Sequence, residues 1–126
     1  MRGIRFTLIA SLALLFCAGC NKIDVDTFID TYWTGTLTDT KANDERSDVS
    51  FKFGTGKADF VYLPYGEQYP ETGVMLYEIA GNQMTIDKAN ETLNGIWTIN
   101  KTGKETLSLT RRSDSETLKI SLIKRK

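Results

Sequence analysis

The stretch that decides the fold covers residues 106–122. It reads Thr106-Leu107-Ser108-Leu109-Thr110-Arg111-Arg112-Ser113-Asp114-Ser115-Glu116-Thr117-Leu118-Lys119-Ile120-Ser121-Leu122. In each half, leucine or isoleucine occupies every second position, as expected of a strand with one buried and one solvated face. The turn residues at 113–115 leave a connection too short for anything but an antiparallel pair. The end of the chain therefore predicts an antiparallel β-hairpin.

The same period-two alternation occurs earlier in the chain, at residues 33–37 and 49–53. Less regular runs rich in β-branched and aromatic residues follow at 59–63, 73–79, 83–87 and 93–99. Turn residues separate these runs, and only a brief helix is expected, near residue 26. About eight strands without a helical pattern predict an all-β fold, a small antiparallel meander that closes into a barrel and so removes both edge strands. A two-sheet β-sandwich is the alternative.

Four aromatic residues fall on the apolar phase of the expected strands: Trp33, Phe51, Phe53 and Trp97. This placement favours core packing over ligand contact. The interior of a barrel of about eight strands is either filled by side chains or holds one small ligand. The short strands of this chain favour a filled interior.

The first 20 residues have the features of an export signal. Arg2 and Arg5 give a positive start, and residues 6–16 form an apolar run too short to span a membrane. Small residues, Ala18-Gly19, then precede Cys20. This pattern resembles the lipobox of bacterial lipoproteins, in which the leader is cleaved before a cysteine that becomes lipidated, and a plain secretory signal is the alternative.

The lipobox resemblance implies a division of the chain into three parts. These are a signal peptide at 1–19, a lipidated Cys20 with a tether at 20–30, and a barrel domain at 31–126. It implies a palmitate-type acyl anchor at Cys20 and a location in the bacterial cell envelope. The outer membrane is favoured, because Asn21 follows Cys20 in place of the aspartate that marks inner-membrane retention.

The composition after Cys20 excludes several kinds of chemistry. This part of the chain contains neither cysteine nor histidine, so it lacks the usual ligands of zinc, copper and iron and the commonest general base. Without Arg2 and Arg5, 14 basic residues face 16 acidic ones, so no nucleic-acid partner is expected. We expect no cofactor, no metal site and no enzymatic activity. A carboxylate-dependent glycan hydrolase is the least favoured alternative.

One loop contains the candidate contact residues. Pro64 and Pro70 bracket an irregular segment that holds Tyr65 and Tyr69. Exposed tyrosines are enriched at recognition surfaces, so these two are candidates for contact with a protein, a glycan or a ligand at the mouth of the barrel. The alternative is that both rings fold back over the barrel end as a plug.

Four segments together resemble the small lipocalin-like lipoproteins of bacterial envelopes: Trp33-Thr34-Gly35, Gly81-Asn82-Gln83-Met84-Thr85-Ile86, Leu93-Asn94-Gly95-Ile96-Trp97 and Leu107-Ser108-Leu109-Thr110. The resemblance spans most of the chain after Cys20 and implies a lipocalin-like barrel. We expect a non-catalytic binding or interaction module of the cell envelope that reaches the membrane through its lipid anchor. A carrier of a small apolar ligand inside the barrel is the main functional alternative.

Overall fold

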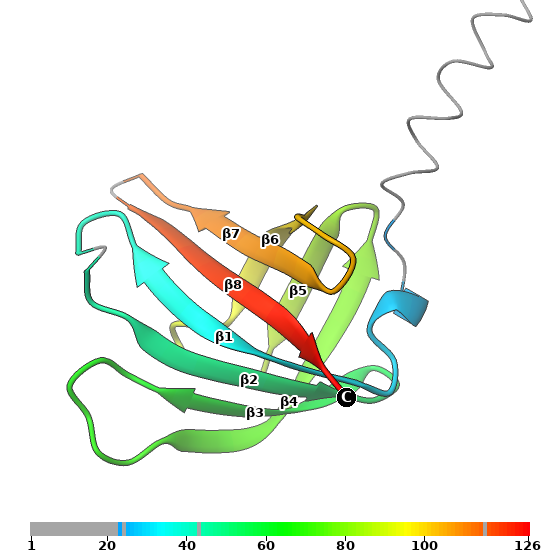
Figure 1. The fold of residues 1–126 in the computed structure, drawn as a ribbon, viewed down its shortest axis with the longest axis horizontal. Helices are drawn as coiled ribbons and strands as arrows, with labels where there is room; N and C mark the ends of the chain where they lie inside the picture. The colour runs from blue at the N-terminus through cyan, green and yellow to red at the C-terminus, as the bar shows by residue number, and fades with distance from the viewer. Residues whose placement is uncertain (1–22, 24, 43, 115) are drawn as a thin grey trace, which may run out of the picture.

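A computed structural model describes residues 23, 25–42, 44–114 and 116–126. It confirms an all-β fold in which eight antiparallel strands form a closed barrel, each paired with the next and β8 paired with β1 (Figure 1). The strands are β1 (Thr31–Asp39), β2 (Ser47–Phe53), β3 (Lys57–Leu63), β4 (Glu71–Ala80), β5 (Gln83–Asp87), β6 (Gly95–Lys101), β7 (Thr106–Arg112) and β8 (Thr117–Arg125). A single sheet that closes on itself excludes the sandwich.

The barrel has two distinct ends. One 3-10 turn, η1 (Val25–Thr27), lies at the end where β1 begins and β8 finishes, together with the β2–β3, β4–β5 and β6–β7 turns. We call this the η1 end. The opposite or far end carries the β1–β2, β3–β4, β5–β6 and β7–β8 connections (Figure 1). An up-and-down barrel alternates its connections in this way, so the two ends present different loops.

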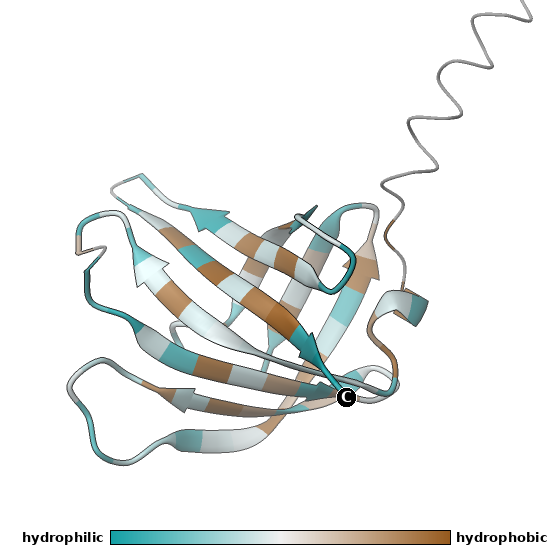
Figure 2. Ribbon diagram, in the orientation of Figure 1, coloured by the Kyte–Doolittle hydropathy of each residue, from teal (hydrophilic) through white to brown (hydrophobic). Residues whose placement is uncertain are grey.

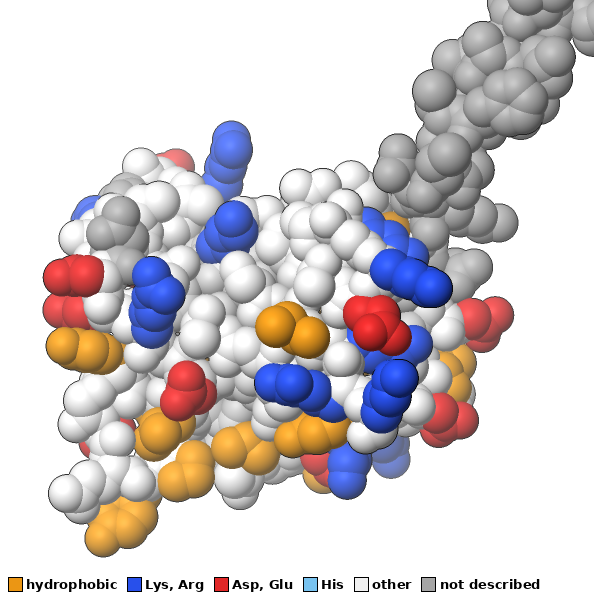
Figure 3. All heavy atoms as spheres, viewed as in Figure 1, with side chains coloured by type: hydrophobic (Ala, Val, Ile, Leu, Met, Phe, Trp, Pro, Cys, Tyr) orange, Lys and Arg blue, Asp and Glu red, His pale blue; other side chains and the backbone are white. Residues whose placement is uncertain are grey.

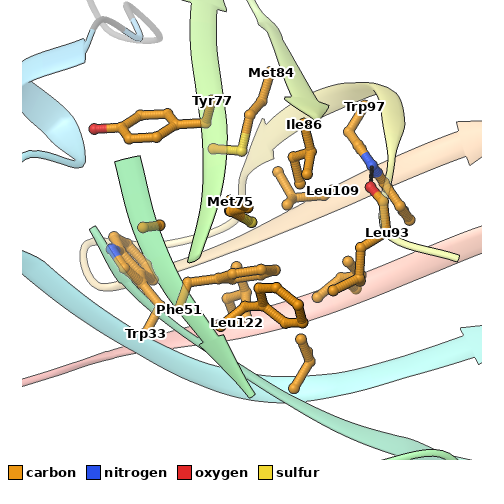
Figure 4. Packing of buried hydrophobic residues seen from close by; sticks show 14 of the residues in the cluster. Trp33, Phe51, Met75, Tyr77, Met84, Ile86, Leu93, Trp97, Leu109 and Leu122 are labelled. Carbon is orange, nitrogen blue, oxygen red and sulfur yellow. Dashed lines mark hydrogen bonds between the residues drawn. The ribbon is translucent and has the colours of Figure 1, made fainter. Parts of the chain in front are cut away.

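Side chains from all eight strands fill the interior. Hydrophobic and polar residues alternate along the strands, most clearly along β8 (Figure 2), so one phase of each strand forms the core. Met75 and Met84 are fully buried near the middle of the barrel, and Trp33 and Phe51 point into the same interior (Figure 4). Trp33, Phe51, Phe53 and Trp97 all belong to the buried core, which confirms the expected core packing.

An aromatic cluster closes the η1 end. Phe28, directly after η1, is 0% exposed, and its ring centroid lies 5.0 Å from that of Phe53 and 6.0 Å from that of Trp33. The Tyr77 ring lies 4.9 Å from Phe53 on the other side. Phe28 lies within the range expected as tether, so packing of the barrel begins before β1. Ile23, the first described residue, also packs against the core.

The seam between β1 and β8 depends on Gly35. A Cβ atom at this position would overlap the backbone oxygen of Ser121 and lie 2.7 Å from its carbonyl carbon. Gly35 pairs with Leu122 across the seam, so only a residue without a side chain lets the first and last strands approach this closely. This contact explains the glycine in the Trp33-Thr34-Gly35 segment.

The strand expected at 93–99 begins later than the apolar pattern indicates. Leu93 lies in a turn, where its N–H donates to the side-chain oxygen of Asn90 at 2.7 Å, and β6 starts at Gly95, whose φ is 136°. Leu93 is nevertheless fully buried, and its carbonyl accepts a 2.8 Å hydrogen bond from Trp97 Nε1 (Figure 4). Alternating hydrophobicity located the buried side chains but not the end of the strand.

Candidate functional site

The loop that holds the two candidate tyrosines connects β3 to β4 at the far end. The Tyr65 N–H donates to Ser47 Oγ at 3.0 Å, and the Glu67 N–H donates to the Pro64 carbonyl at 3.0 Å, so the start of the loop is fixed by hydrogen bonds. The side chains project outward: Tyr65 is 59% exposed and Tyr69 is 80% exposed. Tyr65 lines a far-end cleft of about 410 Å³, and neither ring fills the barrel.

Apolar side chains continue from this loop across the outer surface of β3 and β4. Val61 and Val74 are exposed on that surface, Val74 by 57%. Val61, Leu63 and Pro70 line a surface cleft of about 470 Å³. Figure 3 shows a row of hydrophobic side chains along this edge of the molecule. We call Leu63 and Pro70, with Tyr65 and Tyr69, the apolar band, and Val61 and Val74 lie next to it on the side of the η1 end.

A larger and more basic groove lies on the outer face at the η1 end. It measures about 960 Å³ and spans β1, β2, β3 and β4. Its centre is a row of direct cross-strand neighbours, in which Arg125 pairs with Tyr32, Tyr32 with Lys52, and Lys52 with Asp59. The Lys52 ammonium lies 5.8 Å from the centre of the Tyr32 ring. We call this cleft the η1-end groove.

The mouth of the barrel at the far end contains an arginine that the sequence did not single out. Arg111 follows Leu107 and Leu109 on the inward phase of β7; its guanidinium lies 4.9 Å from the centre of the Trp97 ring and donates to the Asn94 carbonyl. A Cβ atom at Gly95 would lie 2.9 Å from Arg111 Nη1, so this glycine leaves room for the guanidinium. The inward phase of β7 was the signal that could have placed Arg111 in the mouth.

Carboxylates also surround this mouth. Glu45, Glu91 and Glu116 line the same cleft of about 410 Å³ as Arg111. They come from three separate far-end loops, so the topology brings together residues that lie far apart in the sequence. The described part of the chain contains no cluster of three or more Asp, Glu, His or Cys side chains placed to hold a metal ion.

Cys20, the expected lipidation site, lies outside the described residues. Over the part of the chain that the structure describes, no helix is long and apolar enough to cross a membrane. Comparisons of this chain with protein-family models, with curated proteins and with solved structures found no match.

Proposed function

We propose that this protein is a lipid-anchored protein of the bacterial cell envelope, with a lipocalin-like barrel that works as a non-catalytic binding module for another protein. One observation carries the proposal. The barrel is packed with side chains, yet its outer surface carries the apolar band with two exposed tyrosines. Large exposed apolar patches on small soluble domains mark interaction sites. The up-and-down order of eight strands, which lipocalins share, supports the family resemblance.

The place of Phe28 determines how an anchor at Cys20 would orient the barrel. Four residues lie between Cys20 and Val25, so their Cα atoms are at most about 18 Å apart. Phe28 then fixes the chain at the η1 end. Acylation of Cys20 would therefore hold the η1 end near the lipid surface and direct the loop of Tyr65 and Tyr69 away from it. The outer membrane is the proposed location.

The packed interior argues against the carrier alternative. An apolar ligand inside the barrel would have to displace fully buried side chains such as Met75, Met84 and Leu109. Removing such packing costs several kcal/mol for each large side chain. Contact through the outer surface requires no such rearrangement, which favours the interaction module.

The chemistry of the apolar band fits a protein partner. Tyrosines supply rigid contact area with a polar tip, and aromatic anchors dominate the energy of many protein interfaces. Pro64 and Pro70 restrict the backbone on either side of Tyr65 and Tyr69, which lowers the entropy lost when the loop binds.

The test replaces both tyrosines in the full-length gene. The Tyr65→Ala/Tyr69→Ala variant should unfold within about 1 kcal/mol of the parent, because both rings are exposed. It should lose on the order of tenfold in association with its partner. Native mass spectrometry of the protein purified from its host measures the bound fraction, and thermal melting measures stability.

The matched control is Ile96→Ala/Ile123→Ala. These side chains are 56% and 48% exposed but lie outside the apolar band. The control should keep the partner. If the tyrosine variant instead melts much lower while partner association is unchanged, the two rings are a structural cap and the proposed contact surface is wrong.

A further inference from the structure

Charge is distributed unevenly between the two ends of the barrel. Among the described residues, basic side chains outnumber acidic ones at the η1 end, where Lys52, Lys57, Lys101, Lys104, Lys124, Arg125 and Lys126 face Asp26, Asp30, Asp59, Glu78 and Glu105. The far end has the opposite excess, with Lys41, Arg46, Lys88, Arg111, Arg112 and Lys119 against Asp39, Asp44, Glu45, Asp48, Glu67, Glu71, Asp87, Glu91, Asp114 and Glu116. Figure 3 shows Lys and Arg gathered around the η1 end.

The η1-end groove concentrates this positive charge on one face. Lys52, Lys57, Arg125 and Lys126 line it, facing the two carboxylates of Asp30 and Asp59. Arg125 Nε donates to Thr34 Oγ1 at 2.8 Å, which holds the guanidinium against the outer surface of β1. The groove thus combines one hydrogen-bonded guanidinium and three lysine ammonium groups with an aromatic wall formed by Tyr32.

Val61 and Val74 complete the lining of the groove on its β3–β4 side. The combination of lysine, arginine, a tyrosine ring and exposed aliphatic carbon is the composition that protein surfaces present at a membrane interface. There the cations meet lipid phosphates, and the aromatic ring lies at headgroup depth.

We propose that the η1-end groove docks on the headgroups of anionic phospholipids and holds the η1 end of the tilted barrel against the membrane, with the acidic far end directed away from it. Two features argue for a lipid surface as the occupant: charge complementarity, and the start of the described chain at this end, where Ile23 and η1 pack beside the groove's end of the barrel. This inference rests on the proposed function, in which a lipid anchor at Cys20 brings the barrel to a membrane. The anionic lipid surface would repel the acidic far end, which opposes an orientation with that end on the membrane. Docking would therefore leave the loop of Tyr65 and Tyr69 accessible to partners.

The experiment measures vesicle binding without the anchor, using a chain that begins at residue 21. This chain contains all eight strands and every described residue of the core. Co-sedimentation with phosphatidylcholine vesicles containing about a third phosphatidylglycerol, at about 0.1 M salt, should exceed sedimentation with pure phosphatidylcholine. The Lys52→Gln/Lys57→Gln/Arg125→Gln variant should lose on the order of a hundredfold in affinity for the anionic vesicles.

The matched control removes the same charge from the far end. Lys41→Gln/Arg46→Gln/Lys88→Gln should bind anionic vesicles nearly as well as the parent, and circular dichroism should show both variants folded. Equal losses in the two variants, or tighter binding to poly-glutamate than to anionic vesicles, would overturn the proposal, the latter in favour of an acidic polypeptide. Acylation of Cys20 is measured separately, so failure of vesicle binding leaves the anchor proposal standing.

Discussion

Tyr77 joins the aromatic cluster at the η1 end to the β2–β3 turn. Its hydroxyl donates to the Gly54 carbonyl at 2.6 Å, and its own N–H donates to the Gly56 carbonyl at 3.1 Å. Burial raises the pKa of the Tyr77 phenol above its ordinary value of 10.0, and the negative charge of Asp30 adds to this effect, while a backbone hydrogen bond from Gly56 opposes it. The folded protein therefore favours the neutral phenol.

This shift predicts a pH-dependent effect of Tyr77→Phe. Below the ordinary pKa, the variant should lose about 1 kcal/mol of unfolding free energy, because the hydrogen bond to Gly54 is removed. Above pH 10 the unfolded chain releases the Tyr77 phenolic proton more readily than the folded barrel does. The free energy of unfolding of the parent therefore falls as the pH rises, whereas Tyr77→Phe, which has no phenol at this position, lacks this contribution to the fall.

Urea unfolding at about pH 9 and about pH 11 measures the difference. The difference in unfolding free energy between the parent and Tyr77→Phe should be smaller at the higher pH. Tyr69→Phe, which changes an exposed tyrosine, is the control. A gap that stays constant would show that the phenol ionises equally in the folded and unfolded chains.

Single residues also show what the sequence could and could not predict. Trp33 and Trp97 were placed correctly in the core, because strand periodicity alone determines which way a side chain points. The closeness of Arg111 to the Trp97 ring depends on β6 and β7 lying side by side, so it is a tertiary contact. Periodicity describes one strand at a time and gives no such distance.

Among the elements, the seam between β1 and β8 is the most sensitive to a single added carbon. Gly35→Ala should destabilise the barrel by more than about 4 kcal/mol, because the new methyl group would meet the backbone of Ser121 rather than a movable side chain. We expect the cooperative thermal transition to be lost, and near-UV circular dichroism during heating measures this.

Gly54→Ala is the control for this substitution. Its Cβ would lie 3.5 Å from the Lys57 carbonyl oxygen, an ordinary contact, so the variant should melt close to the parent. A Gly35→Ala protein that also melted normally would mean that the seam can widen without cost.

The elements were predictable to different degrees. β2 and β8 alternate cleanly because one face of each is buried and the other is wet, and β5 occupies the expected residues 83–87. β7 alternates in sequence, but Ser108 on its outer face is buried as well. β4 is longer than the expected range 73–79, since its first residues are exposed on both faces and carry no alternation. Backbone pairing with β3 extends the strand there, and pairing leaves no signal in composition.

For the whole molecule, the decisive prediction concerns the anchor. Cys20→Ser should abolish acylation and release the protein from carbonate-washed membranes, because the buried acyl carbons of the proposed anchor, at about 0.8 kcal/mol for each CH₂, would be the part of the membrane affinity that survives this wash. Mass spectrometry of the N-terminal peptide and sedimentation after a carbonate wash measure the two effects. A serine variant that still sediments with washed membranes would contradict lipid anchoring.

At this scale the closed barrel could be predicted from the sequence, because the connections between successive strands are too short for crossovers and make neighbouring strands antiparallel. It also located the loop of Tyr65 and Tyr69. It did not predict the η1-end groove, whose residues come from both ends of the chain and meet only when the barrel closes. Arg125 and Tyr32 lie at opposite ends of the domain sequence yet are direct cross-strand partners.

That closure also determines when the protein finishes folding. β1 lacks its second neighbour until β8 has formed, so an emerging chain exposes the unpaired edge of β1 until nearly its last residue is available. Contacts between such distant segments make folding slow, on the order of milliseconds to seconds. Under the proposed export of the unfolded chain, slow closure would keep the chain competent for transport, and the seam would form only after the C-terminal strand has crossed the membrane.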